Sequence, residues 1–564
     1  YDRMLDVPGN SFPTFNAIEY AVNTFSDGNL KCVTSAGGSY TSGCTRFFPA
    51  TGKWYTEVTN TADANTEIGI VAAGYNGLTQ LTLQPSGYCY YATSGAKWNN
   101  GVSAAYGATY TSGDVIGVLF DADAGKLYFS KNGVIQNSGD PVAGTGFAYS
   151  GLTGTYCIAV GDGGSSAATI HLNSGQAPLT AGATYDAASG GYFRYTPPSD
   201  YKALCQRNMP DPAILNPEKH FDVVTYTGNS SYPRAVVSGL QFQPDLSWIK
   251  SRSLTTTNHI LQNSVQGAGT GQALYSDLTS AAGAQDLYGY VSAFNSDGVS
   301  VNKTGANGEN VNYTGTTYVD WLWKAGGAAV TNNAGSISSQ VSANVTAGFS
   351  IVTYTGNGSA GATVGHGLGK APGLILNFRR GPTGANHFIF CDKLNGGVTP
   401  GNYYLLLSGT GAQTADSLVW NNTAPSSTVF TLGSTGEVNA NTNTFVAYCF
   451  AEIPGFSKIF SYTGNGSADG PFVHCGFKPK YILLKNASAD GGWVIHDTVR
   501  QTYNFDQLEL YPYLSNAEAT GSGGVDVLAN GFKVRSTLTY DNGNTNTIIG
   551  IAFADVPAKY SLAR

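Results

Sequence analysis

Charged side chains are scarce in this chain. Asp, Glu, Lys and Arg make up 12% of its 564 residues, and the formal net charge is −7, whereas roughly a quarter of an ordinary soluble domain is charged. A nucleic-acid-binding surface needs clustered Lys and Arg that displace counterions from the phosphates. The composition therefore predicts no nucleic-acid partner.

Long apolar runs are missing as well. No stretch approaches the ~18 apolar residues that a membrane-spanning helix needs, so we expect no insertion into a membrane. No secretory signal pattern begins the chain, and its first residue is Tyr1 rather than Met. We therefore expect a processed product, or the ordered part of something longer.

No two of the eight cysteines stand in a CxxC pair, so neither a zinc site nor a redox motif is predicted. We expect no metal and no cofactor. Cys157 and Cys449 fall inside apolar strand patterns and are predicted to be buried thiols. Cys32 and Cys44 flank a Gly/Ser loop, where they could pair across a hairpin or stay reduced.

Glycine (73 residues) and tyrosine (35 residues) are abundant, and Ser, Thr and Asn accompany them. Thr and aromatic residues suit a pleated, half-buried surface, while Gly and Asn supply the positive φ angles of tight turns. This composition predicts an all-β protein with few or no long helices.

The C-terminal part of the chain carries one motif three times. The strings are FDVVTYTGNSS (221–231), FSIVTYTGNGS (349–359) and FSKIFSYTGNGS (456–467), the last with one extra residue before its tyrosine. A spacing of over 100 residues exceeds the ~20–50 residues of a solenoid unit. We therefore predict three tandem, related β-sandwich domains, at 220–326, 348–454 and 455–564.

Each motif tyrosine (Tyr226, Tyr354 and Tyr462) is predicted to pack in a core or between domains, and the residues after it to form a turn. No helix signal follows, so no phosphate-binding loop is implied. Residues 327–347, rich in Ala, Gly, Ser and Asn, are predicted to be a linker. The alternative is an extended strand that pairs with a neighbouring subunit.

Alternating strand patterns with strong turn signals fill residues 17–176. The string GDVIGVLFDADAGKLYFSKNG (113–133) encodes two strands joined by a turn and a second turn at Asn132-Gly133. Residues 52–58 (GKWYTEV) form another strand, in which Glu57 points inward. Residues 1–16 and 177–219 are predicted to be linker segments.

These strings, together with EIGIV at 67–71 and YCIAVGDGG at 156–164, resemble the SPRY family in order and approximate spacing. The resemblance covers about 160 residues. It implies a bent, concanavalin-like β-sandwich whose loops recognise a partner, without catalytic residues. The loops of this chain are short of charge, unlike those of many partner-binding members, so the ligand stays open.

The segments around this domain carry a second resemblance. Residues 5–10 (LDVPGN), 193–204 (FRYTPPSDYKAL) and 208–214 (NMPDPAI) resemble linker sequences of tailed-bacteriophage virion proteins. Such proteins place a SPRY-like or lectin-like sandwich ahead of tandem YTGNG domains. The resemblance implies a non-enzymatic virion structural protein of the tail-fibre or particle-surface appendage type, assembled in the host cytoplasm and exposed on the particle.

The expected partners are other virion proteins, copies of the chain itself and host-envelope glycans. A homo-oligomer is expected, and fibres are commonly trimeric. Linking weak sites on a polyvalent particle would make adhesion effective. Two alternatives stay open: a purely structural capsid or tail component without an external ligand, and a polysaccharide depolymerase of the tailspike type.

Four aromatic residues lie close together in the SPRY-like segment: Tyr88, Tyr90, Tyr91 and Trp98. Sugars stack on such rings, which makes these residues the candidate ligand-binding site. Alternation along a strand places half of them in the core instead.

Other chemical patterns favour structural readings. Asp121-x-Asp123-x-Gly125 begins like a calcium loop but lacks the downstream ligands, and we interpret it as a turn with Asx hydrogen bonds. His259, His387 and His496 invite a general-base hypothesis, but their polar neighbours change between copies, which favours structural polar pairs. A depolymerase would need two carboxylates across a groove; the candidates by residue type alone are Glu437, Glu452, Glu509 and Glu518.

Overall fold

The computed structural model describes residues 10–18, 22–35, 40–61, 65–75, 77–164, 166–177, 180–305, 307–381, 386–557 and 559. The chain divides into two compact units, an N-terminal unit (Tyr1–Asp211) and a C-terminal unit (Pro212–Arg564). Strands dominate both, and each of the α-helices in the described ranges is a single turn, which confirms the predicted all-β class. None of these helices is long and apolar enough to cross a membrane.

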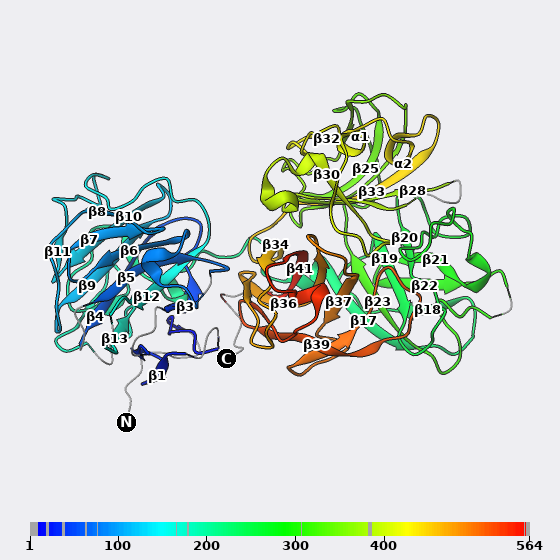
Figure 1. Cartoon of the computed structure of the whole chain (residues 1–564). Helices are drawn as coiled ribbons and strands as arrows, with labels where there is room; N and C mark the ends of the chain where they lie inside the picture. The colour runs from blue at the N-terminus through cyan, green and yellow to red at the C-terminus, as the bar shows by residue number, and fades with distance from the viewer. Residues whose placement is uncertain are drawn as a thin grey trace. The chain divides into compact units, whose positions relative to one another are not determined.

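Two packed sheets form the N-terminal unit (Figure 1). The first has the order β1 (Thr24–Ser26), β2 (Lys31–Val33), β13 (Thr169–Asn173), β4 (Lys53–Asn60), β9 (Val115–Asp121), β10 (Lys126–Lys131), β11 (Val134–Ile135), and β16 (Tyr201–Ala203) joins it on β4. The second has the order β3 (Thr41–Phe47), β12 (Tyr156–Asp162), β5 (Thr66–Ala72), β6 (Gly87–Tyr91), β7 (Ala96–Asn99), β8 (Val102–Ala105). The strands β9 and β10 are those predicted in 113–133.

The core of this unit lies between the two sheets, where Ile116, Phe129 and Ile158 are fully buried. Alternation along each strand sends every second side chain into this layer. Burial of large apolar side chains contributes roughly 1.5–3 kcal/mol each. The sandwich is therefore held mainly by apolar packing between the sheets.

The segments predicted as linkers around this domain contain ordered parts of it, up to residue 211, which corrects two sequence predictions. In 177–219, β14 (Thr184–Asp186) pairs with β15 (Gly191–Phe193), and β16 pairs in parallel with β4. The buried carboxylate of Glu57 accepts hydrogen bonds from the amides of Arg194 and Tyr195 at 2.9 and 2.8 Å. In 1–16, Phe12 and Phe15 are buried, while residues 1–9 lie outside the described ranges.

Three four-stranded arrays with the same strand order form the C-terminal unit (Figure 1). We number them as repeats 1, 2 and 3. Repeat 1 has β17 (Phe221–Thr227), β23 (Thr317–Trp323), β19 (Leu246–Ser251) and β20 (Ile260–Asn263). Repeat 2 has β26 (Phe349–Thr355), β33 (Thr444–Phe450), β28 (Leu374–Arg379) and β29 (Phe388–Cys391). Repeat 3 has β34 (Ser457–Thr463), β41 (Thr547–Pro557), β36 (Phe477–Asn486) and β37 (Trp493–Asp497).

A second sheet faces each array. These sheets comprise β18 (Arg234–Val237), β22 (Gly298–Asn302) and β21 (Tyr290–Asn295) in repeat 1; β27 (Ala362–Gly365) and β32 (Val429–Leu432) in repeat 2; and β35 (Phe472–His474), β40 (Gly531–Val534), β39 (Ala519–Leu528) and β38 (Asp506–Glu509) in repeat 3. The single-turn helices are α1 (Ser417–Trp420), α2 (Gly436–Asn439) and α3 (Thr539–Asn542). Each repeat has its own apolar core between its two layers.

The three repeats share a further core. Trp323, Phe450 and Phe553 occupy matching positions in β23, β33 and β41, each opposite the first residue of β17, β26 or β34. All three belong to one buried cluster. The space left at its centre accommodates about one water molecule. The repeats are therefore one compact unit rather than separate bodies on a string, although their exact boundaries stay a prediction.

Matching backbone hydrogen bonds close the three repeats into a ring. Ala282 N donates to Arg380 O, Gln413 N to Ala487 O, and Glu518 N to Arg252 O, each at 2.8 Å. A loop of repeat 1 thus contacts a strand of repeat 2, repeat 2 contacts repeat 3, and repeat 3 contacts repeat 1. The first and the last repeat of the C-terminal unit are therefore in contact with each other.

The recurring YTGN motif makes a set of hydrogen bonds to a distant loop of its own repeat, and we call this set the clamp. The Tyr226, Tyr354 and Tyr462 hydroxyls donate to the carbonyls of Val311, Val438 and Asp541 at 2.5–2.8 Å. The motif asparagine amides of Asn229, Asn357 and Asn465 donate to the side-chain oxygens of Asn312, Asn439 and Asn542 at 2.9–3.0 Å. The motif therefore ties the first strand of each repeat to the loop before its last strand.

Residues 327–347, predicted to be a linker, contain β24 (Val330–Asn332) and β25 (Ser339–Asn344). These strands extend the sheet of repeat 2, with β25 antiparallel to β26. The alternative of a strand that pairs with a neighbouring subunit is not needed here, because the strand pairs within its own chain. The Ala- and Ser-rich composition suits this position because small side chains fit alongside a neighbouring strand.

Candidate functional site

Two of the four predicted ligand-binding aromatics belong to the core. Tyr90 is fully buried, and its ring packs on Tyr106, Tyr110 and Phe129 with centroid separations of 5.0–5.7 Å. Tyr88, half-buried, points to the same side of β6 and packs against that core. A stacking role for Tyr90 is thus incorrect, because no face of its ring reaches solvent.

Tyr91 and Trp98 lie on the opposite face of the same sheet. Residues of alternating number on β6 face opposite sides, and Trp98 on β7 pairs with Cys89 across the strands. The rings of Tyr91 and Trp98 meet edge to face with centroids 6.1 Å apart, and both are half-buried. The structure therefore brings together these two of the four predicted residues at the surface.

One exposed apolar residue accompanies them. Leu83, in the 3₁₀ turn η1 (Leu81–Leu83), is 49% exposed. This turn lies on the same face of the sheet, because the Thr82 hydroxyl donates to Glu67, which stands opposite Tyr91. We call Leu83, Tyr91 and Trp98 the aromatic edge.

Sequence analysis missed the apolar member of the aromatic edge. Leu83 had no sequence signal, because its exposure depends on how η1 folds over the sheet.

The aspartates at 121–125 form a turn, as predicted. Asp121 Oδ1 accepts from Ala124 N at 3.0 Å, and Asp123 Oδ1 accepts from Gly52 N at 2.9 Å. Their carboxylates are thus engaged by backbone amides. In the described part of the chain no three His, Cys, Asp or Glu side chains are arranged to hold a metal ion.

All eight cysteines are buried. Cys32 and Cys44 are free thiols, which settles the alternative that the sequence left open in favour of the reduced pair. Burial raises the pKa of Cys32 to about 12. A buried, protonated thiol of this kind is a poor nucleophile.

Two of the histidines hold neighbouring repeats together. His259 Nε2 bonds to Tyr511 O of repeat 3 at 3.0 Å, and His387 Nε2 bonds to Leu278 O of repeat 1 at 2.7 Å. At the matching position in repeat 3, Trp493 Nε1 donates to Leu406 O of repeat 2 at 2.9 Å. Burial lowers the pKa of His387 to about 4. The two imidazoles are neutral hydrogen-bond donors at the interfaces between repeats rather than general bases.

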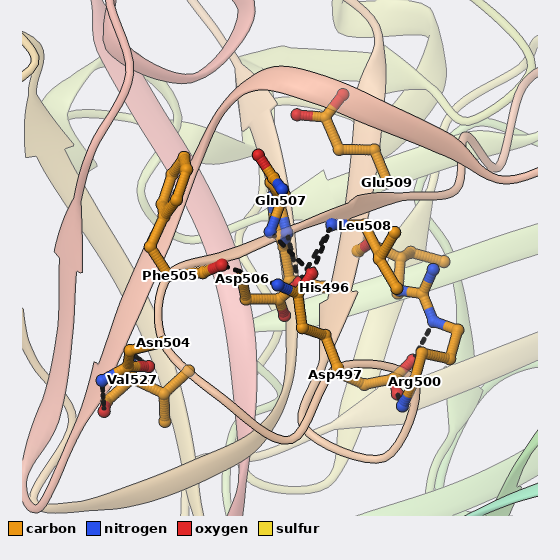
Figure 2. A network of polar contacts seen from close by, with 12 residues as sticks. His496, Asp497, Arg500, Asn504, Phe505, Asp506, Gln507, Leu508, Glu509 and Val527 are labelled. Atoms are coloured by element: carbon orange, nitrogen blue, oxygen red, sulfur yellow. Dashed lines mark hydrogen bonds and ion pairs between the residues drawn. The ribbon is translucent and has the colours of Figure 1, made fainter.

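His496 has a different environment (Figure 2). Its Nδ1 lies 3.8 Å from Asp506 Oδ1 inside repeat 3, and both side chains are buried. This distance is too long for a hydrogen bond and marks a charge interaction. Burial lowers the pKa of His496, but Asp506 and Glu509 outweigh this effect and raise it above the ordinary value.

Beside this pair, Arg500 and Asp497 (Figure 2) begin a buried chain of charges that joins repeat 3 to repeat 1. Arg500 Nε donates to Asp497 Oδ2 at 2.5 Å, and Arg500 Nη1 donates to Glu518 Oε1 at 2.9 Å. Trp321 Nε1 of repeat 1 donates to Asp497 Oδ2 at 3.0 Å. The guanidinium of Arg500 is fully enclosed, so these partners replace its water.

The candidate carboxylates are engaged in contacts within the fold. Asn386 N donates to Glu437, Lys458 pairs with Glu452, Tyr511 and Tyr540 hydroxyls donate to Glu509, and Arg252 and Arg500 pair with Glu518. Such partners suit structural carboxylates. The aromatic edge is therefore the candidate functional site. It can bind a ligand, because it offers two rings and one aliphatic side chain beside the neutral amide of Asn65, whose Oδ1 accepts from the Tyr91 hydroxyl at 3.3 Å.

Two family models match the chain. One is described as a domain of unknown function (DUF7483) and matches residues 216–557; the other is the SPRY domain and matches residues 53–174. The second match confirms the SPRY-like part of the sequence prediction. None of the curated proteins matches this chain.

Solved SPRY structures also match. The SPRY domain of human HERC1 is 15% identical with a TM-score of 0.23, and the alignment covers 28% of this chain and 96% of that chain. The TRIM65 PSpry domain is 17% identical with a TM-score of 0.23, covering 28% of this chain and 91% of that chain. The SPRY assignment rests on the family model, and these likenesses add no argument about function.

Proposed function

The chain belongs to the DUF7483 family across residues 216–557. We propose that it is a structural protein of a tailed-bacteriophage virion. It would be a tail-fibre-like or particle-surface appendage without enzymatic activity that adheres to the host surface. Its partners are other virion proteins and copies of itself, and its external ligands are host-envelope glycans. It would be assembled in the host cytoplasm and exposed on the particle.

The observation that carries this proposal is the aromatic edge on a SPRY-like sandwich. Half-buried rings held by a rigid sheet provide flat apolar surface at little entropic cost. The exposed Leu83 widens that surface. The neighbouring Asn65 is a neutral amide, which favours an uncharged, polyhydroxylated ligand such as a neutral glycan.

The C-terminal unit supports the proposal in a second way. Its repeats form one closed body, so they serve as a platform rather than as separate flexible arms. Multivalency would therefore come from many copies of the chain on one particle, each offering one aromatic edge. Weak binding by each copy would be sufficient.

Two measurements test the proposal. Electron cryomicroscopy of the particle should place the chain on its outside with the aromatic edge facing solvent. Purified chain should bind neutral bacterial surface glycans on an array, and Trp98→Ala should weaken binding at least tenfold while Tyr185→Ala, an exposed tyrosine of the hairpin β14–β15, should not. Density buried between other virion proteins, with no glycan bound, would favour a purely structural component instead.

A further inference from the structure

The first strand of repeat 2 has a neighbouring strand on its outer side, whereas the first strands of repeats 1 and 3 have none. In repeat 2, β26 is flanked by β25, which lies between it and β24. In repeats 1 and 3, the matching strands β17 and β34 end their four-stranded sheets. An edge strand presents unpaired amides and carbonyls, which are a template for pairing with another chain.

The pairing in repeat 2 defines what these edges can accept. Strand β25 is antiparallel to β26, with Ser342 opposite Ile351 and Gln340 opposite Thr353. Its sequence, SQVSAN, contains small and polar residues and no charge. Because the three repeats share one strand order, an uncharged antiparallel strand of this kind fits the same side of β17 and β34.

A carboxylate occupies that side in the other two repeats. Val223, Ile351 and Ile459 each stand three residues before the motif tyrosine, and are therefore equivalent. In repeat 1, Val223 N donates to Asp222 Oδ1 at 2.8 Å. In repeat 3, Ile459 N donates to Glu452 Oε2 at 3.3 Å.

Each of these carboxylates is also held by a lysine. Lys480 Nζ lies 2.7 Å from Asp222 Oδ1, and Lys458 Nζ lies 2.8 Å from Glu452 Oε1. A strand that docked on either edge would have to displace the carboxylate from its amide and enclose a charge. Removing water from a charge is unfavourable even when an ion-pair partner stays with it.

We propose that Asp222 and Glu452 guard two strand-docking edges of the C-terminal unit, and that the partner these edges fit is an antiparallel, uncharged strand of a second copy of this chain. The two positions differ in sequence, one within its strand and one before it. They nevertheless deliver the same chemistry to the same amide. The guards keep copies of the chain from joining sheet to sheet, so contacts between copies are left to other surfaces.

The test compares molar mass against concentration by light scattering after size exclusion, for the full chain and its variants. Asp222→Ala/Glu452→Ala should associate, with a mass that rises with concentration above that of the wild type. Glu452→Ala alone should associate to a smaller extent, and it leaves the contact of Lys480 with repeat 1 intact. Amides of β34 should become protected from hydrogen exchange in the associated form.

Two matched variants separate the edge from other causes. Lys458→Ala removes the ion pair but leaves the carboxylate of Glu452 on its amide, so the mass should stay that of the wild type. Ser461→Lys places a charge on the exposed part of β34 and should restore the wild-type mass in the Glu452→Ala background. The proposal is overturned if folded Glu452→Ala keeps the wild-type mass at every concentration, or if Ser461→Lys leaves the association unchanged.

Discussion

Arg252 of repeat 1 and Glu518 of repeat 3 form a two-pronged ion pair, with Arg252 Nε 3.0 Å from Glu518 Oε1 and Arg252 Nη2 2.8 Å from Glu518 Oε2. The same carboxylate accepts from the enclosed Arg500 at 2.9 Å. Repeats 1 and 3 are not joined by a direct chain connection. Glu518 is therefore one of the groups that hold them together, beside Asp497, which accepts from Trp321.

Glu518→Ala should therefore destabilise the C-terminal unit by about 3 kcal/mol, because it leaves Arg500 enclosed without one of its partners. The change in the free energy of unfolding is measured by chemical denaturation, with hydrogen exchange of peptides from this unit as the readout. Lys393→Ala is the control: it breaks an exposed ion pair with Asp392 and should cost less than about 1 kcal/mol. Equal effects of the two substitutions would contradict this role for Glu518.

The C-terminal unit should lose stability as the pH rises from about 6.5 to about 8. Burial raises the pKa of Asp320 to about 8, of Asp277 to about 7 and of Asp541 to about 6, from 3.8. A raised pKa in the folded state means that stability is fully present below the unfolded value and is lost as the pH rises through the folded values. Burial also lowers the pKa of Lys250 and Lys485 from 10.5 to about 8, but that contribution changes only above pH ~8.

Below pH ~6.5 the buried histidines oppose this trend, because burial lowers the pKa of His387 to about 4 and of His474 to about 3, so their contribution to stability rises with pH. The free energy of unfolding, measured by denaturant titration at several pH values, should thus fall as the pH rises from about 6.5 to about 8. Asp320→Asn removes the group that titrates last and keeps an acceptor for the Ser247 hydroxyl, which donates to Asp320 at 2.9 Å. This variant should flatten the upper part of the profile. A profile that rises over the same range would contradict the burial of neutral carboxyls.

Gly356 of the second YTGN motif should tolerate no side chain. A Cβ atom there would lie 2.4 Å from Ala440 O, so Gly356→Ala should force the clamp open and cost about 2–4 kcal/mol. Gly358→Ala, two residues later, would meet its nearest atom at 3.6 Å but keep a φ of +71°. It should cost only about 1–2 kcal/mol. Thermal unfolding of both variants checks the order.

Tyr90→Ala should destabilise the N-terminal unit by about 3–5 kcal/mol, the usual range for removing a large enclosed aromatic side chain. Trp98→Ala, on the exposed face, should cost much less. Hydrogen exchange of β6 and β9 peptides distinguishes the two. If Trp98→Ala unfolded the unit as readily as Tyr90→Ala, the assignment of Trp98 to a binding surface would be wrong.

Local patterns predicted the parts of the fold whose causes are local. Alternation and the Asn132-Gly133 turn placed β9 and β10, and the recurring motif predicted the tyrosines and turns that the clamps contain. Ring closure left no such trace. Tyr511 O, Leu278 O and Leu406 O accept bonds from His259, His387 and Trp493, and any residue can offer a carbonyl.

The candidate site divides in the same way. Period-2 alternation predicted that half of the four aromatics lie in the core, and Tyr90 does. Which half faces solvent depends on the side of the sheet that the second sheet covers, and a single strand does not determine this. Asp222 and Glu452 were still harder to foresee, because they reach equivalent amides from positions that no alignment of the motifs would pair.

The shared central core has a consequence for synthesis. Phe221, at the start of β17, stacks on Phe553 of β41 with ring centroids 4.9 Å apart. These two strands are the first and the last of the C-terminal unit along the sequence. On the ribosome, repeats 1 and 2 emerge with their inner faces bare until β41 leaves the exit tunnel. Contacts so distant along the chain form slowly, and bare apolar faces aggregate. We therefore expect the nascent chain to be prone to aggregation during translation. A product truncated before β41 would keep the apolar faces of its central core exposed to solvent.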